Sequence, residues 1–435
     1  MTTRVTMARL SATATLVALV AGCGGGGGGG GSSSSSGVGT LVFGELMPFT
    51  GDQATEGGQV TNGCQPAIAV INKAGGVLGN KVTCQEFDTR GDAVDAVPAA
   101  QKMLATTTNL VGVLGPSTAE APATEPLLQQ ANMPMFSVAG DPQFDKSTDP
   151  YFYRFTPADD LAAKALALEA KNLGYKRVAV VFTAGDSAQA NVPSLQAVAP
   201  ILGLQITDAL SITPNQPSYR TEVAKLLANH PDVIINEGDP QSDATFFGQL
   251  KEAGGNIPMV ITAVATFSDW QNAMSTAMGS AVLADLMTVI DPYTPTEGEG
   301  WQVFNDTLKG LHGNGVDYKQ YNADIYSRTT YDACIAMALA MTASNSIDPK
   351  TYNPHIADIL TPGSDKTTVH TYQEGLDALK ASKKIYLVGA GGELGLNQYH
   401  SVAGAFETQH YDPATKALVH VGVIPNDELK ALSLG

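Results

Sequence analysis

Short apolar runs alternate with longer amphipathic stretches from residue 40 onward, and this alternation limits the possible folds more than any other feature of the chain. The stretch between the first two runs carries Val60, Cys64, Ile68 and Ile71 at helical spacing. Strands that alternate with helices in this way are typical of βαβ units and a parallel sheet. In the first half, four runs are predicted to be strands: residues 40–47, 81–87, 110–114 and 133–138.

The same order of elements returns after residue 176. An internal repeat of this length implies two similar α/β lobes with a cleft between them. The aromatic segment 151–157 is predicted to cross, extended, from one lobe to the other. The predicted strands of this half are residues 177–182, 204–210, 232–236 and 258–262, with helices such as 218–228 and 242–253 between them.

The last third of the chain is predicted to contribute to both lobes. We assign residues 40–155 and 287–397 to the first lobe and residues 156–286 and 398–435 to the second. The elements expected here are a strand-like run at 283–290, helices at 299–311 and 326–344, a strand at 384–388, and a hairpin of residues 403–411 and 418–423.

Length and charge narrow the class of protein. The chain has 435 residues, more than the roughly 250 to 300 that one hydrophobic core usually organises, so two domains are expected. Its 25 Lys and Arg residues are outnumbered by 42 Asp and Glu residues, which gives a formal net charge of −17. This excess of acid repels phosphate backbones and argues against a nucleic-acid partner.

The amino terminus is predicted to be a signal peptide over residues 1–22, with Arg4 and Arg9 before a short apolar run. The cleavage region, residues 20–23, resembles the lipobox of bacterial lipoproteins, which implies a lipid on Cys23. An ordinary signal peptide followed by an incidental cysteine is the alternative. Residues 23–39, rich in Gly and Ser, are predicted to be a flexible tether. We therefore expect an exported protein of the cell envelope, on the periplasmic side, that contacts the membrane through its lipid.

Three further cysteines follow the tether. In an oxidising compartment we predict a disulfide between Cys64 and Cys84, which for a loop of this size contributes roughly 3 kcal/mol. Two separate buried thiols are the alternative. Cys334 lies in an apolar helical stretch and is predicted to be a buried thiol. No spacing of cysteines and histidines predicts a metal site.

Ligand-binding candidates follow predicted strands, because ligands of parallel sheets bind at the carboxyl ends of the strands. Ser117 and Thr118 follow the third strand and open a helix, whose free N–H groups favour an anion such as a carboxylate. A plain helix cap is the alternative. The segment 136–140, with Ser137 and Ala139, has small residues that let a ligand approach the backbone, or it is an ordinary turn.

Four other residues are candidates on weaker grounds. Thr50 lies in the loop after the first strand, which either covers a ligand or is a simple turn. In the second lobe the candidates Asp186, Ser187 and Glu237 lie at strand ends. A carboxylate in a dry cleft would pair with a ligand ammonium group, whereas solvated surface carboxylates are common.

Enzyme motifs are weak in this sequence. It has no G-x-S-x-G, no phosphate-binding P-loop, no H-E-x-x-H and no conspicuous histidine cluster. The glycine-rich residues 389–392 resemble a dinucleotide-binding loop, but no clear helix and second strand follow them. We predict neither an enzyme nor a cofactor, while a catalytic pair assembled from distant positions stays open.

Several segments together resemble a known family: Thr50-Gly51, Gly57 and residues 69–79, 112–118, 152–157, 174–181 and 331–333. They are similar to the branched-chain amino-acid binding family, the type I periplasmic solute-binding proteins of ABC transporters. The resemblance covers nearly the whole mature chain and is most specific over residues 71–79. Many members are lipoproteins, in agreement with the predicted lipid on Cys23.

This resemblance implies a two-lobed Venus-flytrap fold, with parallel sheets flanked by helices and three hinge crossings. Such a protein closes on a solute and presents it to a membrane permease. We therefore expect a monomeric, lipid-anchored solute-binding component of an ABC importer with a small carboxylate-bearing ligand, an amino acid or a related compound. A sensory receptor of the same fold is the first alternative, and an exported hydrolase is the second.

The resemblance also implies which residues hold the solute. In the second lobe the sequence departs from the family, because Ser187 stands where many members have an aromatic residue. Val264 lies near the position of an ammonium-binding acid in some members, so Glu237 or Asp186 would have to replace that acid. Members also bind amides, urea and aromatic carboxylates. The α-carboxylate of an amino acid is expected on Ser117, Thr118 and the backbone near Ala139, with Ser137 beside them.

Overall fold

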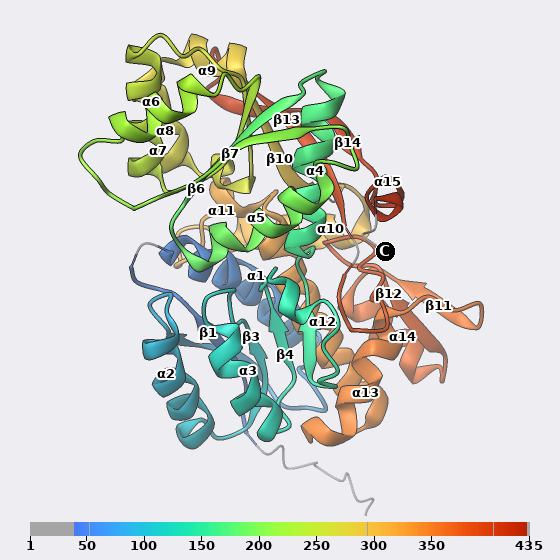
Figure 1. Cartoon of the computed structure of the whole chain (residues 1–435). Coiled ribbons are helices and arrows are strands. Elements are labelled where there is room, and N and C mark those ends of the chain that lie inside the picture. The colour runs from blue at the N-terminus through green and yellow to red at the C-terminus, as the bar shows by residue number, and fades with distance from the viewer. Residues whose placement is uncertain (1–38, 52, 294, 403, 433–435) are drawn as a thin grey trace, which may run out of the picture. The chain divides into compact units, whose positions relative to one another are not determined.

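The computed structural model describes residues 39–51, 53–293, 295–402 and 404–432 (Figure 1). The side chains of Asp186, Ser187 and Ala190 also lie outside this description. The predicted signal peptide, Cys23 and the tether up to residue 38 lie outside the described residues as well. Among the described helices, none has the length and apolar character needed to cross a bilayer.

The first sheet consists of five parallel strands in the order β2-β1-β3-β4-β5. All seven residues of β1 are buried, because this strand lies between β2 and β3 in the sheet. The four strands predicted in the first half are confirmed within two residues at each end. The strands are β1 (Leu41–Met47), β2 (Val82–Asp88), β3 (Leu110–Leu114), β4 (Met135–Ser137) and β5 (Phe152–Arg154).

Helices cover both faces of this sheet (Figure 1). Alternate residues of β1 face the two layers, since Phe43 packs with α1 and α12 while Leu46 packs with α2 and α3. The elements around this sheet are α1 (Ala54–Lys73), α2 (Ala93–Thr106), α3 (Ala121–Gln130), η1 (Pro142–Phe144), α10 (Gly298–Leu311), α11 (Tyr318–Tyr321), α12 (Ile325–Ser344), α13 (Pro349–Leu360), β11 (Lys366–Val369), α14 (Tyr372–Lys380) and β12 (Lys384–Leu387).

The second sheet has seven strands in the order β14-β13-β10-β9-β8-β6-β7. Strands β6 to β10 run parallel, and β13 and β14 add an antiparallel hairpin at one edge. The strands are β6 (Arg177–Thr183), β7 (Gln205–Ile212), β8 (Val233–Glu237), β9 (Met259–Ile261), β10 (Met287–Tyr293), β13 (Ala405–Asp412) and β14 (Ala417–Ile424).

Two helical layers enclose the second sheet. One layer contains α4 (Asp159–Asn172), α5 (Asp186–Val198) and α15 (Asn426–Ala431). The other contains α6 (Arg220–Ala228), α7 (Pro240–Glu252), η2 (Ala263–Thr266), α8 (Ser268–Met278) and α9 (Ser280–Leu286). The two repeats of strands and helices therefore form two α/β layered units within residues 37–435, as the sequence pattern predicted.

Strand β10 corrects the predicted lobe boundary. We placed residues 287–397 in the first lobe, but β10 pairs in parallel with β9 and antiparallel with β13, so it belongs to the second sheet. Val289 and Ile290 pack into the two opposite cores of that sheet, which explains the position of the strand. The predicted strand-like run also begins too early, because residues 280–286 form α9.

The glycine-rich segment 389–392 has a structural role. The backbone N–H groups of Ala390 and Gly391 donate to the carboxyl oxygens of Asp332 on α12, at 2.8 and 2.6 Å. A methyl group at Gly389 would overlap that carboxyl group. The segment therefore wraps a buried acid of the protein, in place of the phosphates of a dinucleotide.

The cysteines lie in the core of the first unit. Cys64 of α1 and Cys84 of β2 form a disulfide, which confirms the predicted pair. Cys334 of α12 is a buried free thiol, as predicted, and its Sγ lies 3.9 Å from Sγ of Cys64. The disulfide ties the first helix to the second strand of the sheet.

Candidate ligand-binding site

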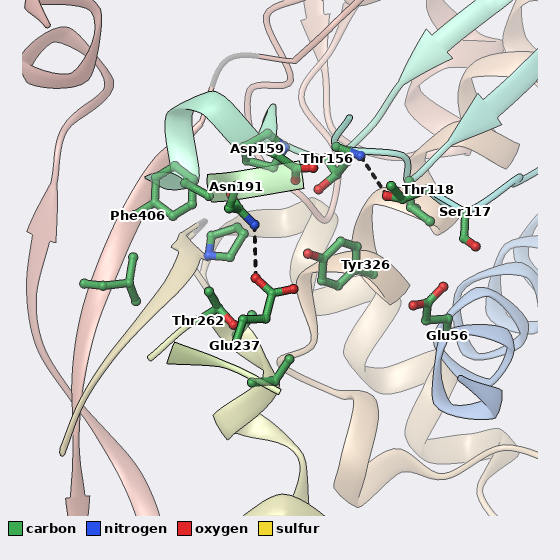
Figure 2. A pocket seen from close by; sticks show the side chains of 18 of the residues that line it. Glu56, Ser117, Thr118, Thr156, Asp159, Asn191, Glu237, Thr262, Tyr326 and Phe406 are labelled. Atoms are coloured by element: carbon green, nitrogen blue, oxygen red, sulfur yellow. Dashed lines mark hydrogen bonds between the residues drawn. The ribbon is translucent and has the colours of Figure 1, made fainter. Parts of the chain in front are cut away.

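A cavity of about 170 Å³ lies at the carboxyl ends of strands from both sheets (Figure 2). Ser117 and Thr118 follow β3, Gly140 follows β4, Glu237 ends β8 and Thr262 follows β9. Because ligands of parallel sheets bind at these ends, the cavity is the candidate site.

The loop after β3 provides two predicted site residues, and both line the cavity. The backbone N–H and the hydroxyl of Ser117 donate to Oε2 of Glu120, at 3.0 and 2.9 Å. The hydroxyl oxygen of Thr118 accepts from the N–H of Gly140 at 3.2 Å. The N–H and hydroxyl groups of Ser117 that were expected to hold a carboxylate are therefore bonded within the protein.

Ser137 and Ala139 are fully buried and lie outside the lining of the cavity. The Ser137 hydroxyl donates to the carbonyl of Pro116 at 2.7 Å and accepts from the N–H of Ala139 at 3.0 Å. These bonds fasten the loop after β4 to the loop after β3. Neither residue lines the cavity, so the predicted contact of Ser137 and Ala139 with a ligand stays a prediction.

The remaining predicted residues divide into three cases. Thr50 does not line the cavity, because its hydroxyl donates to Oδ2 of Asp88 at 2.6 Å and its N–H to Oδ1 at 3.2 Å. Asp186 and Ser187 begin α5, and their side chains lie outside the described residues. Glu237 lines the cavity, as expected for a second-lobe acid.

Three carboxyl groups line the cavity, from Glu56, Asp159 and Glu237. In Figure 2, Glu56 lies on one side of Tyr326, and the other two carboxyl groups lie on the opposite side. Glu56 belongs to the first turn of α1 and Asp159 begins α4. Oε2 of Glu237 accepts from Nδ2 of Asn191 on α5 at 3.0 Å.

Burial shifts the protonation of all three groups. It raises the pKa of Glu56 to about 7 and that of Glu237 to about 8, with smaller contributions from the charges of Glu120 and Asp159, respectively. It raises the pKa of Asp159 to about 7, although the guanidinium of Arg154 opposes this shift. A cation bound among these acids would favour their charged forms.

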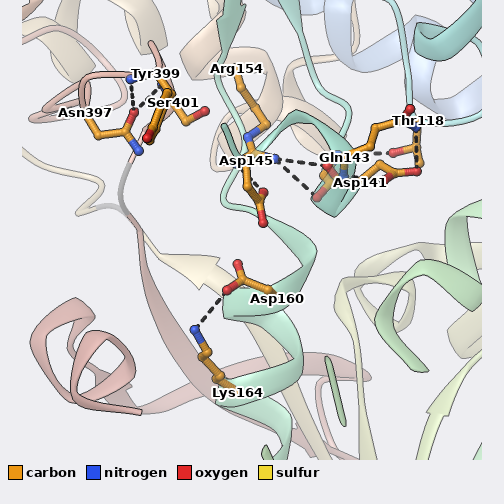
Figure 3. A network of polar contacts seen from close by, with 11 residues as sticks. Thr118, Asp141, Gln143, Asp145, Arg154, Asp160, Lys164, Asn397, Tyr399 and Ser401 are labelled. Carbon is orange, nitrogen blue, oxygen red and sulfur yellow. Dashed lines mark hydrogen bonds and ion pairs between the residues drawn. The ribbon is translucent and has the colours of Figure 1, made fainter. Parts of the chain in front are cut away.

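Arg154 ends β5 and is itself buried, and Figure 3 shows its polar contacts. Its guanidinium pairs with Asp145 at 2.8 Å and donates to the carbonyls of Gly140 and Asp141, at 3.4 and 3.3 Å. Its backbone bonds to residues 400–402, just before β13, at 2.9 and 3.0 Å. Arg154 therefore joins two connections between the sheets, and its charge is paired with Asp145.

Apolar side chains form the rest of the wall. Leu166 comes from α4, Ile290 from β10 and Phe406 from β13. Val264, which the resemblance placed near an ammonium-binding acid of some family members, also lines the cavity. The site thus combines carboxyl groups with a hydrocarbon surface.

Glu56, Asp159 and Asn191 are lining residues that the sequence analysis missed. Glu56 and Asp159 lie in first helical turns, where acids commonly stabilise the helix dipole, so no local signal separates them from ordinary helix starts. Asn191 reaches the site because α5 packs beside α4.

Comparison with known proteins agrees with this geometry. The family model described as periplasmic binding protein matches residues 40–353. The Leu/Ile/Val-binding protein homolog 3 of Brucella melitensis is 26% identical over 215 residues, which cover 49% of this chain and 58% of the relative. The Leu/Ile/Val-binding protein BraC3 of Rhizobium johnstonii is 27% identical over 223 residues, which cover 51% and 60% of the two chains. The match thus spans about three fifths of each relative.

Solved structures share the fold over a larger part of the chain. The leucine-binding protein LivK of Thermotoga maritima has a TM-score of 0.70 at 18% identity, over 89% of this chain and 99% of its own. A solute-binding protein of R. palustris, in complex with benzoate, has a TM-score of 0.69 at 14% identity, over 88% and 96% of the two chains. Both similarities establish the two-lobed α/β architecture.

Proposed function

Because this chain belongs to the periplasmic binding protein family, we propose that it is the extracytoplasmic, lipid-anchored solute-binding component of an ABC importer. It captures a small solute between its two α/β units and delivers it to a permease in the membrane. The protein acts as a monomer, and the lipid on Cys23 holds it at the membrane. Its own step breaks no covalent bond.

The cavity is the observation that carries this proposal. Its wall combines residues from both sheets, so a solute bound there contacts both units at once and favours the state in which they are close. The curated relatives are Leu/Ile/Val-binding proteins, which supports an amino acid or a related compound as the class of solute.

An α-carboxylate on Ser117 and Thr118 stays a prediction of this proposal. Such a ligand would have to replace Glu120 as the acceptor for the Ser117 N–H and hydroxyl groups. The ligand would gain hydrogen bonds to Ser117 only by breaking those between Ser117 and Glu120, so the net gain in free energy is small. The affinity for an amino acid would then depend on its other contacts with the cavity.

Thermal-shift measurements and isothermal titration with a broad panel of small solutes test the function. We expect at least one solute to raise the melting temperature and to be recovered unchanged by NMR after incubation. Full-length chain and its Cys23→Ala variant, expressed in a bacterial host, test the anchor: the wild type should sediment with membranes and the variant should not. Turnover of a bound solute would instead support the hydrolase.

A further inference from the structure

We infer that the solute of this cavity is a small organic dication, with an ammonium or guanidinium group at each end of a short aliphatic chain. This inference rests on the proposed solute-binding function, and within that function it replaces the α-carboxylate ligand with a solute that carries no carboxylate. It follows from the acids, the unpaired acceptors and the hydrocarbon surface of one cavity.

The carboxyl groups are placed at two positions along the cavity. Glu56 lies on the side of the first sheet, while Asp159 and Glu237 lie across Tyr326 from it (Figure 2). Glu237 is within electrostatic range of both other acids. Each position can therefore receive one cationic group, and a ligand with a single charge leaves one position uncompensated.

Two buried side chains point to the same class of ligand. Asn191 is 4% exposed and Thr262 is 9% exposed, and both line the cavity. The Nδ2 group of Asn191 donates to Glu237, whereas Oδ1 of Asn191 and Oγ1 of Thr262 have no hydrogen-bond partner in the protein. The amide oxygen of Asn191 can only accept and the hydroxyl of Thr262 can accept as well as donate, so a ligand that supplies N–H donors at this end satisfies both groups.

The protein itself does not balance the acids. Among the described residues that line the cavity there is no Lys, Arg or His. The nearest guanidinium described above, that of Arg154, is paired with Asp145 at 2.8 Å. Arg154 therefore offsets only part of the charge of Asp159, and the rest of the charge of Glu56, Asp159 and Glu237 is balanced by protons or by the ligand.

The other residues of the wall disfavour a ligand with a carboxylate and favour one with a hydrocarbon chain. The N–H and hydroxyl of Ser117 are bonded to Glu120, and a ligand carboxylate there would lie close to Glu56 as well. Leu166, Ile290 and Phe406 offer a surface for methylene groups instead. An α,ω-diamine satisfies both conditions.

Isothermal titration and thermal shift with the full chain test this inference. The probes are diaminobutane, diaminopentane, butylamine, leucine and benzoate. We expect the two diamines to bind at least about tenfold more tightly than butylamine, which has one ammonium group, and leucine and benzoate to bind still more weakly.

Two variants locate the charges. Glu56→Gln and Glu237→Gln keep the size of the side chain and each should weaken diamine binding about tenfold or more. Glu252→Gln removes the same charge from an exposed position on α7, where it pairs with Arg220, and should leave binding unchanged. Circular dichroism confirms that each variant is folded.

The outcomes separate this inference from the proposed function. Tight binding of leucine or benzoate, without binding of the diamines, overturns the dication and leaves the solute-binding function intact. Equal affinity for diamines and butylamine, or unchanged affinity in both Gln variants, also overturns it. If no probe binds, the inference fails, and native mass spectrometry of the purified protein, with or without a retained solute, decides the proposed function separately.

Discussion

At the scale of single residues, Gly140 positions one of the acids of the cavity. Its carbonyl accepts from the N–H of Asp159 at 2.8 Å, and a methyl group on Gly140 would overlap the Asp159 carboxyl. Gly140→Ala should therefore move that carboxyl, lower the free energy of unfolding by about 1–3 kcal/mol and weaken solute binding. Urea unfolding and titration calorimetry measure the two effects.

A second glycine provides the matched control for this change. A Cβ at Gly248, inside α7, would lie 3.6 Å from Cβ of Ala277, an ordinary contact. Gly248→Ala should leave binding unchanged and, by removing a helical glycine, stabilise the protein by about 0.5–1 kcal/mol. Equal effects of the two substitutions would contradict the role given to Gly140.

The sequence predicted the position of a residue at the cavity where that position follows directly from a predicted strand. Ser117 and Thr118 follow a strand of a parallel sheet, so their place at the cavity could be inferred from the strand alone. The partner of Ser117 had a local signal that the sequence analysis missed, because Ser117 and Glu120 have the S-x-x-E spacing of a capping box, in which the acid accepts from the N–H of the serine. Glu56 was missed because a first-turn acid looks the same whether it faces solvent or a cavity.

At the scale of elements, the disulfide joins α1 to β2 across a sequence separation of 20 residues. Loop closure of this size contributes about 3 kcal/mol. A reductant should therefore lower the urea midpoint of the wild type, and it should not affect the Cys64→Ala/Cys84→Ala double variant. Thiol titration verifies that the wild-type bond has been reduced. An unchanged midpoint after complete reduction would show that the disulfide adds no stability.

A local sequence pattern predicts where strands and helices occur, but it does not predict which distant elements they contact. Each predicted strand of the two repeats is present, because apolar runs between amphipathic helices specify a buried parallel sheet. The sheet to which β10 belongs was mispredicted, since membership depends on pairing with β9 and with the distant β13. The role of the glycine-rich segment 389–392 likewise depends on a residue that is far away in the sequence, because its backbone N–H groups bind the carboxyl group of Asp332.

At the scale of the whole molecule, the repeat predicted two α/β units with a cleft between them, and the structure has two sheets with a cavity at the carboxyl ends of strands from both. The repeat could not predict the electrostatics of the cavity, because the acids come from α1, α4 and β8, which are far apart in the sequence. These acids come to line one cavity only when both α/β units are folded.

The burial of these three carboxyl groups in one cavity makes the stability of the protein depend on pH. The pKa of Glu56 is raised from 4.5 to about 7, that of Asp159 from 3.8 to about 7, and that of Glu237 from 4.5 to about 8. In this range the folded protein holds protons that the unfolded chain has released, so these groups make the unliganded protein less stable as the pH rises from about 5 to 8. The charged groups that act on these three acids, besides each other, are Glu120, Asp141, Asp145, Arg154, Asp160 and Asp243.

Thermal unfolding between pH 5 and pH 9 checks this expectation, with and without diaminobutane. The melting temperature of the free protein should fall with rising pH, and the fall should be smaller in Glu237→Gln, which has lost one of the titrating groups. A bound dication favours the ionised acids, so the diamine should stabilise the protein more at pH 8 than at pH 6. A diamine effect that is independent of pH would mean that the cation does not bind among Glu56, Asp159 and Glu237.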